Sequence, residues 1–190
     1  FWIKKMMETY VGMDYDRGLN LLKDYAEDGE IHSKLNFLGE SQYDGCNYIY
    51  IREKSTIDEI PISMKKNFEE LMPYAHRTEG MRPHDAFCIY HKFDVAKNIC
   101  EYTAGVPYDE KPRDLPSHYK LGKQDAAKIY TLEHIGPYEH LGNAWSTLHN
   151  MIRSKELKIV KRYHPFETYG NSPKDTHPHE LISRIHFAVK

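Results

Sequence analysis

Three stretches of the chain place apolar residues at the three- and four-residue spacing of an amphipathic helix. The first runs from Asp14 to Glu27 and stops before Gly29, where a C-cap glycine would lie. The second contains Pro61, which a helix tolerates in its first turn. The apolar positions are Tyr15, Leu19, Leu22 and Ala26 in the first helix, Ile57, Ile60, Met64, Phe68 and Leu71 in the second, and Leu141, Trp145, Leu148 and Ile152 in the third.

Shorter stretches alternate in polarity or are rich in aromatic and β-branched residues, as is typical of β-strands. We predict strands over residues 31–37, 47–51, 86–90, 98–104, 127–133, 166–169 and 181–189. The segment Gln42-Tyr43-Asp44-Gly45 is a turn signal between the first two of these strands.

From Cys46 onward the order strand, helix, strand, strand occurs twice. Matching positions are Tyr50 with Tyr130, Tyr90 with Tyr169, and Val106 with Val189, a nearly constant offset of about 80 residues. We therefore predict an α+β fold of two pseudosymmetric β-α-β-β repeats that form antiparallel sheets with a central groove, plus an N-terminal helix. The boundaries would be a helical extension over 1–40 and a domain over 41–190, with repeat one at 46–107, a linker at 108–123 and repeat two at 124–190.

Composition narrows the classes of function. The net charge is −2 with both signs interspersed, so we expect no direct nucleic-acid partner. We expect neither a membrane span nor a signal peptide, because no apolar run is long enough. Three cysteines without CxxC spacing favour a reducing, cytoplasmic setting. The chain begins on Phe1-Trp2-Ile3, which suggests a portion of a longer protein. We expect a monomer or weak dimer.

The strand around Glu167 carries the leading candidate for a site. Glu167 follows Phe166 and, by alternation, shares a face with Tyr169. A carboxylate among aromatic rings suits an apolar or cationic small molecule, and desolvation would raise its pKa. On pattern alone, a solvent-facing glutamate on an edge strand is the competing interpretation.

Metal and cofactor sites are not expected. The densest histidine cluster, His177 and His179 with His164 nearby, is separated by proline and lacks the HExxH register. The sequence also lacks a glycine-rich phosphate loop and a GxSxG elbow.

Several motifs resemble the GyrI-like small-molecule-binding domain of AraC- and MerR-type bacterial regulators, which is related in fold to the SOUL haem-binding proteins. They are His134-x-Gly136-Pro137-Tyr138 before a helix with Trp145, Pro165-Phe166-Glu167-x-Tyr169-x-x-x-Pro173, and the closing strand over 181–189. The resemblance covers about Cys46 to Lys190. Residues 1–40, with Asp14-Tyr15-x-x-Gly18-Leu19, are similar to the final helix of polyketide-cyclase-like (SRPBCC) domains.

The resemblance implies a groove between the repeats in which a buried glutamate, at Glu167, receives a hydrophobic or aromatic ligand, including cationic ones. The chain would then be a sensor or sequestering protein. The implied ligand-binding residues are Glu167, Tyr48, Tyr50, Tyr90, Tyr102, Trp145, Tyr169 and His186. The sequence departs from the family pattern at His186, where an aromatic hydroxyl is usual, and at Ala188, where proline is usual.

Two alternatives stay open. In some family members the same groove hydrolyses strained cyclopropane-containing electrophiles, which would make Glu167 a general base and Tyr102 a hydroxyl donor. A groove that accepts a partner peptide is the third interpretation, and a shallow groove without a carboxylate at its floor would favour it.

Overall fold

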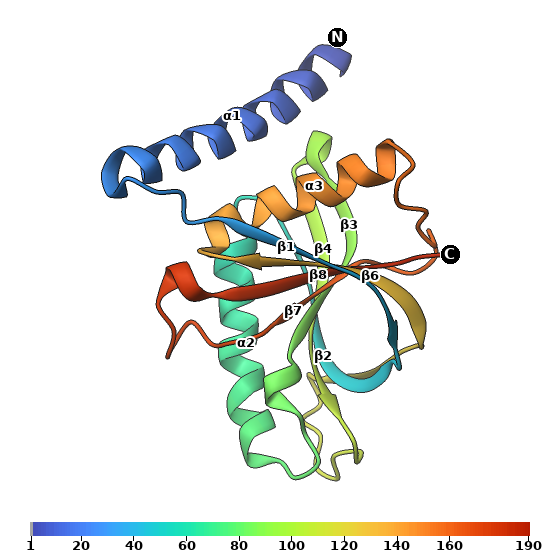
Figure 1. The fold of residues 1–190 in the computed structure, drawn as a ribbon. Helices are drawn as coiled ribbons and strands as arrows, with labels where there is room; N and C mark the ends of the chain where they lie inside the picture. Colours follow the sequence, from blue (N-terminus) through green and yellow to red (C-terminus); the bar gives the residue numbers. More distant parts are fainter. Residues whose placement is uncertain (1) are drawn as a thin grey trace.

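The computed structural model describes residues 2–190, with side chains from Val11 onward. One antiparallel sheet forms the body of the molecule, and helices α2 and α3 cover one of its faces (Figure 1). The helices are α1 (Trp2–Asp28), α2 (Ile60–Arg77) and α3 (Leu141–Arg153). The strands are β1 (Lys34–Tyr43), β2 (Cys46–Ser55), β3 (Phe87–Asp94), β4 (Ile99–Tyr108), β5 (Lys120–Gln124), β6 (Ala127–Ile135), β7 (Phe166–Tyr169) and β8 (Ile182–Ala188). None of the helices described is both long enough and apolar enough to span a bilayer.

The strand order β1-β6-β8-β7-β3-β4-β2-β5 reveals two equivalent halves. The unit β2-α2-β3-β4 matches β6-α3-β7-β8, and the two halves meet where β3 pairs with β7. Cys88 on β3 lies directly opposite Glu167 on β7, so an approximate two-fold axis passes beside this pair. The predicted α+β fold with duplicated halves is confirmed, although the two halves share a single eight-stranded sheet.

The outermost strands are exchanged between the halves. β1 precedes β2 in the chain but pairs with β6, whereas β5 precedes β6 but pairs with β2. The two connections meet near Gly45, whose φ of +78° lies in the left-handed region. A Cβ on Gly45 would lie 2.3 Å from the Gln124 carbonyl oxygen, so the close approach of the two connections requires glycine here.

The two faces of the sheet carry separate cores. On the helix-covered face, Ile49, Leu71 and Tyr102 are buried beneath α2, and Leu132, Leu148 and Ile185 beneath α3. On the opposite face, a third cluster has a buried centre of Tyr48, Phe87, Ile89, Ile129 and Phe166.

Several sequence expectations differ from the structure in detail. The segment expected to be a linker, 108–123, ends inside β5, which is short, polar and contains Gly122. The sheet register places Thr131, not Tyr130, at the position equivalent to Tyr50, because Tyr50 pairs with Gly105 and Thr131 with His186. Pro61 does lie in the first turn of α2, as expected.

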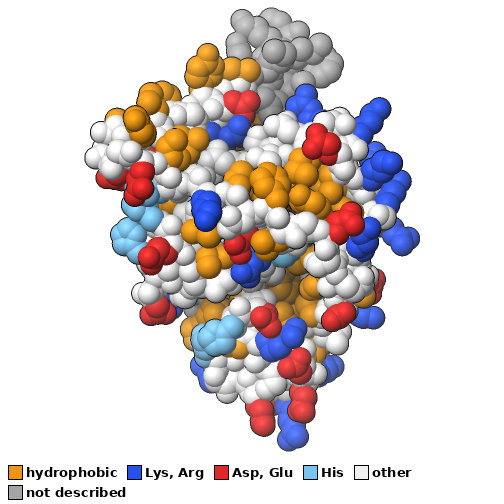
Figure 2. Space-filling model, viewed as in Figure 1, with side chains coloured by type: hydrophobic (Ala, Val, Ile, Leu, Met, Phe, Trp, Pro, Cys, Tyr) orange, Lys and Arg blue, Asp and Glu red, His pale blue; other side chains and the backbone are white. Residues whose placement is uncertain are grey.

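Helix α1 extends well beyond the predicted stretch and lies beside the domain (Figure 1). Its expected apolar face is exposed rather than buried, since Tyr15, Leu19 and Leu22 all keep more than half of their surface, and hydrophobic side chains stand out along it in Figure 2. The helix is attached near its C-terminal end, where Asp24 accepts a hydrogen bond of 2.7 Å from Nε2 of the buried His140. Whether 1–40 derives from an SRPBCC domain stays a prediction.

Candidate functional site

Glu167 lies at the centre of the sheet, on the face that the helices cover. It pairs with Cys88 on one side and with Ile185 on the other, and only 1% of its surface is exposed. Since β7 is an interior strand with neighbours on both sides, the solvent-facing interpretation of this glutamate is excluded.

Three aromatic donors hold the carboxylate. The indole Nε1 of Trp145, on α3, donates a hydrogen bond to Oε1. The hydroxyls of Tyr90, on β3, and Tyr169, on β7, donate to Oε2 at 2.9 and 3.1 Å. Both halves of the domain therefore contribute to one carboxylate.

The rings around the carboxylate follow the internal symmetry. Trp145 of α3 lies edge-on to Tyr90 of the first half, with ring centroids 5.1 Å apart. Phe68 of α2 lies edge-on to Tyr169 of the second half, at 5.7 Å. Two positions break the symmetry. Cys88 takes the place of Glu167 in the first half, and Phe68, which has no N–H to donate, takes the place of Trp145. The carboxylate and the indole donor therefore belong to the second half, while the first half contributes the Tyr90 hydroxyl.

Burial is the main electrostatic influence on the site. Burial raises the pKa of Glu167, and the hydrogen bonds from Trp145, Tyr90 and Tyr169 oppose that rise by stabilising the ionised form. Burial and the nearby carboxylate together raise the pKa of Tyr90 and Tyr169 well above the ordinary value, so both hydroxyls stay protonated donors. Among the described side chains, no lysine, arginine or histidine forms an ion pair with Glu167.

Of the other residues expected in the groove, Tyr102 lies beside Tyr90 on the same face, whereas Tyr48 and Tyr50 do not. The hydroxyl of Tyr102 donates to Ser63 and accepts from Asn67, at 2.8 and 3.0 Å, and makes no hydrogen bond to Glu167. Tyr48 and Tyr50 belong to the opposite face, because strand alternation turns them away from Ile49, which lies on the helix side. Tyr48 and Tyr50 therefore do not line the same site as Glu167.

His186 also lies on the opposite face. It stacks on Phe166 with ring centroids 4.5 Å apart, and its two ring nitrogens are hydrogen-bonded to the hydroxyls of Thr131 and Thr168, both at 2.9 Å. Burial lowers its pKa to about 4, so the ring is neutral near pH 7. His186 is separated from the Glu167 carboxylate by the thickness of the sheet.

Comparison with known proteins assigns the family. Residues 42–190 match the GyrI-like small molecule binding domain. The chain belongs to the GyrI-like family. No curated protein sequence matches it.

Solved structures share the fold of this GyrI-like chain at low identity. EcmrR, in a cryo-EM structure of its complex with DNA, is 15% identical with a TM-score of 0.65, and the alignment covers 99% of this chain and 69% of that one. The isolated EcmrR C-terminal domain is 16% identical with a TM-score of 0.66, and the alignment covers 83% of this chain and 98% of that domain. SAV2435, in a structure bound to tetraphenylphosphonium, is 17% identical with a TM-score of 0.61, and the alignment covers 83% of this chain and 94% of that one.

Sequence reasoning assigned one residue of this GyrI-like site to a turn. Tyr138, in the connection between β6 and α3, lies edge-on to Tyr169 with ring centroids 6.1 Å apart. Its pKa is raised to about 12 by burial and by the Glu167 carboxylate, yet 40% of its surface is exposed. The sequence Gly136-Pro137-Tyr138 indicated a turn at this position, but residue spacing alone does not show that the turn packs against β7.

Proposed function

We propose that this chain binds a hydrophobic aromatic cation at Glu167 and acts as a sensor or sequestering protein. One observation carries the proposal: a fully buried carboxylate is held by three aromatic donors, Trp145, Tyr90 and Tyr169, without a cationic partner among the described side chains. The donors are neutral, so they orient the negative charge without cancelling it.

The energetics favour a cation over an anion or a neutral polar ligand. An ionised carboxylate that is buried without a counter-ion costs several kcal/mol of solvation, which neutral hydrogen bonds offset only in part. A cation whose charge is spread over aromatic groups costs less to desolvate than an ammonium ion. The surrounding rings of Trp145, Phe68 and Tyr138 offer apolar contact and cation–π attraction.

The likeness to SAV2435 supports this ligand class, because that structure holds tetraphenylphosphonium, a hydrophobic aromatic cation. At 17% identity the likeness concerns the fold, so the ligand of the present chain is inferred from its own residues.

Access to Glu167 requires a ring to move. The carboxylate is 1% exposed, whereas Tyr138 at the edge of the aromatic cluster is 40% exposed. Tyr138 lies in a connection rather than within the sheet, which makes it the side chain that a ligand displaces at least cost. We expect Tyr138→Ala to speed association of the cation in stopped-flow fluorescence, with little change for Tyr163→Ala on the opposite face.

The decisive experiment compares a cation with a neutral molecule of similar shape. Quenching of tryptophan fluorescence by tetraphenylphosphonium and by triphenylphosphine oxide is titrated for the wild type and for Glu167→Gln. We expect the substitution to lower the affinity for the cation roughly tenfold or more and to leave the affinity for the neutral compound unchanged. Glu133→Gln, which alters a glutamate paired with Arg184 at 2.9 Å, is the matched control. Equal loss for both compounds, or no loss, would contradict the proposal.

Hydrolysis of a strained electrophile is the second candidate, because a carboxylate with a raised pKa suits a general base. Tyr102 makes no hydrogen bond to Glu167, so the donor would have to be Tyr90 or Tyr169. Turnover of cyclopropane-bearing electrophiles that disappears in Glu167→Gln would support this function.

A further inference from the structure

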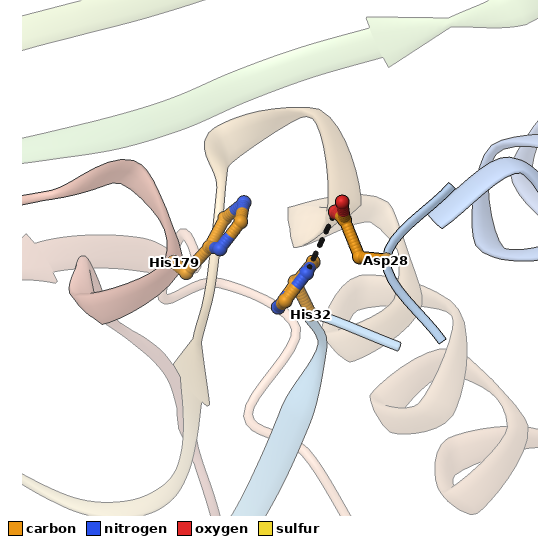
Figure 3. Close-up of side chains that lie close together, drawn as sticks. All are labelled: Asp28, His32 and His179. Atoms are coloured by element: carbon orange, nitrogen blue, oxygen red, sulfur yellow. Dashed lines mark hydrogen bonds and ion pairs between the residues drawn. The ribbon is translucent and has the colours of Figure 1, made fainter. Parts of the chain in front are cut away.

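We propose that Asp28, His32 and His179 form a binding site for a divalent cation of the zinc class, where the end of α1 meets the second half of the domain (Figure 3). The inference is independent of the Glu167 site and of the ligand that binds there. It also reverses the expectation from the sequence that the chain has no metal site.

Three separate segments supply the ligands. Asp28 is the last residue of α1, His32 lies in the connection to β1, and His179 lies in the loop between β7 and β8. The potential ligating atoms, one from each residue, all lie within 4.8 Å of one another. Nε2 of His32 is 3.0 Å from Oδ2 of Asp28, and the rings of His32 and His179 stack with centroids 3.5 Å apart and planes at 13°. Figure 3 shows the Asp28 carboxylate and the two imidazole rings lying close together, with the hydrogen bond between His32 and Asp28 dashed.

The donor set matches the chemistry of zinc. Two imidazoles and one carboxylate are ligands that Zn²⁺ takes at about 2.0–2.2 Å in a tetrahedral arrangement. In such a site the ligating atoms are about 3.3 Å apart, so they must approach one another by about 1–2 Å. The two stacked rings must also turn out of their parallel arrangement, so that their in-plane lone pairs meet at the metal. Asp28 is exposed and both histidines are partly exposed, so these rotations are unobstructed by the core.

One neighbour, His177, can complete the coordination, because its ring lies 4.7 Å from that of His179. Oε1 of Glu30 lies 4.0 Å from Nδ1 of His32, on the other side of that ring from Asp28, and adds negative charge nearby. Nδ1 of His177 accepts a hydrogen bond from the backbone N–H of His179, which holds the His177 ring beside that residue. Histidine side chains also gather at the surface beside this end of α1 in Figure 2.

The lone pair of His179 is available for a metal. Within the part of the chain that the structure describes, neither ring nitrogen of His179 makes a hydrogen bond. A cation shared by the two rings would be attracted by the carboxylates of Asp28 and Glu30. Face-to-face packing of the two rings without an ion is the alternative that the experiment has to exclude.

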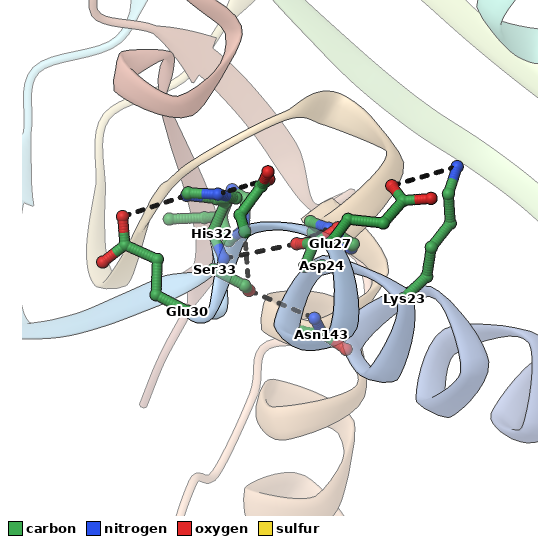
Figure 4. Close-up of polar contacts among 10 residues, drawn as sticks. Lys23, Asp24, Glu27, Glu30, His32, Ser33 and Asn143 are labelled. Atoms are coloured by element: carbon green, nitrogen blue, oxygen red, sulfur yellow. Dashed lines mark hydrogen bonds and ion pairs between the residues drawn. The ribbon is translucent and has the colours of Figure 1, made fainter.

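A cation here would strengthen the attachment of α1. Polar contacts already join the helix and its connection to the domain: Asp24 accepts from the His32 backbone N–H at 3.3 Å, and Asn143 donates to the Ser33 hydroxyl at 3.1 Å (Figure 4). A metal bound by Asp28, His32 and His179 would add a direct link from α1 to the β7–β8 loop. Binding would therefore protect the last turn of α1 from opening.

The test uses the full chain without an affinity tag, after removal of metals with a chelator. Isothermal titration with Zn²⁺ should give one site per chain, and Co²⁺ should give the visible absorption bands of a tetrahedral complex. We expect Asp28→Asn, His32→Ala and His179→Ala each to weaken binding roughly tenfold or more. His118→Ala is the matched control, because His118 forms a single pair with Glu70 elsewhere on the surface. Mg²⁺ should not compete.

Hydrogen exchange of the α1 amides separates a metal site from nonspecific histidine binding. Zn²⁺ should slow exchange around residues 24–32 in the wild type and in His118→Ala but not in His179→Ala, while circular dichroism confirms that each variant is folded. Wild-type affinity in His179→Ala, several weak sites with no dominant one, or unchanged exchange around residues 24–32 would overturn the proposal.

Discussion

Tyr90 and Tyr169 occupy equivalent positions in the two halves of the domain and donate to the same oxygen of Glu167. Each lies two residues beyond the Cys88–Glu167 pair, on strands that run in opposite directions. The approximate two-fold axis therefore places one hydroxyl on each side of the carboxylate. The internal symmetry of the fold therefore supplies the two hydroxyl donors as a pair.

This arrangement predicts a matched response to removal of either hydroxyl. Tyr90→Phe and Tyr169→Phe each delete a hydrogen bond that opposes the raised pKa of Glu167. Since a hydrogen bond to a charged group stabilises the ionised form, each variant should raise that pKa further. Cation affinity measured from pH 5 to 9 should then fall off at a higher pH in both variants. Tyr102→Phe is the control, and a profile like that of the wild type in Tyr90→Phe or Tyr169→Phe would contradict the assignment.

Glu167→Gln should stabilise the folded chain above neutral pH. The folded-state pKa of Glu167 is raised, so the folded state binds its proton more tightly than the unfolded state, and stability is lost as pH rises through that pKa. Glutamine keeps the side-chain shape without the charge: its oxygen can accept from Trp145, and its NH2 can donate to the tyrosine hydroxyl oxygens once these rotate. We expect a gain of about 1 kcal/mol in the free energy of unfolding by urea at pH 8 and less at pH 5. Destabilisation at both pH values would show that Glu167 has a structural role instead.

Acidification should destabilise the domain through His186. Its pKa falls from 6.5 to about 4 on folding, mainly because of burial, so the unfolded state binds more protons between these values. Stability is therefore unaffected by this group above pH 7 and decreases by about 2–3 kcal/mol as the pH falls to 4. In His186→Gln the decrease in the free energy of unfolding between pH 7 and 4 should be smaller by that amount. In the exposed control His118→Gln it should equal that of the wild type. Urea unfolding across this pH range is the measurement.

Gly45→Ala should weaken the junction of the exchanged strands. A Cβ there meets the Gln124 carbonyl oxygen at 2.3 Å, and the left-handed φ adds backbone strain. We expect a loss of about 2 kcal/mol or more in urea unfolding. Gly18→Ala within α1, where nothing lies within 4 Å, should leave the domain unchanged or stabilise the helix by up to about 1 kcal/mol. Equal stability of the Gly45 and Gly18 variants would contradict the close approach.

The sequence predicted most of the fold because helix and strand periodicities are local. The apolar stripes of α2 and α3 and the alternation in β2, β6 and β8 identify those elements without knowledge of the partners. β5 was missed because Lys120-Leu121-Gly122-Lys123-Gln124 has almost no apolar pattern and becomes a strand only by pairing with β2. Local signals cannot report a pairing across the domain.

The site was predictable only in part. Alternation correctly put Glu167 and Tyr169 on one face, since they belong to the same strand. It could not relate the face of Tyr48 and Tyr50 to that of Glu167, because a shift of one residue in the register between strands reverses every side chain. The metal-ligating cluster was beyond reach for a similar reason: Asp28 and His179 are distant in sequence and meet only through the docking of α1.

The exchanged outer strands also bear on the origin of the domain. If β1 paired with β2 and β5 paired with β6, each half would have its own complete sheet. Instead β1 pairs with β6 and β5 with β2, so the outer strand of each half comes from the other half of the chain. This is the geometry of a domain-swapped homodimer whose two copies have been joined into one chain. Halves produced by cutting the chain between β4 and β5 should accordingly reassemble with each other rather than fold apart.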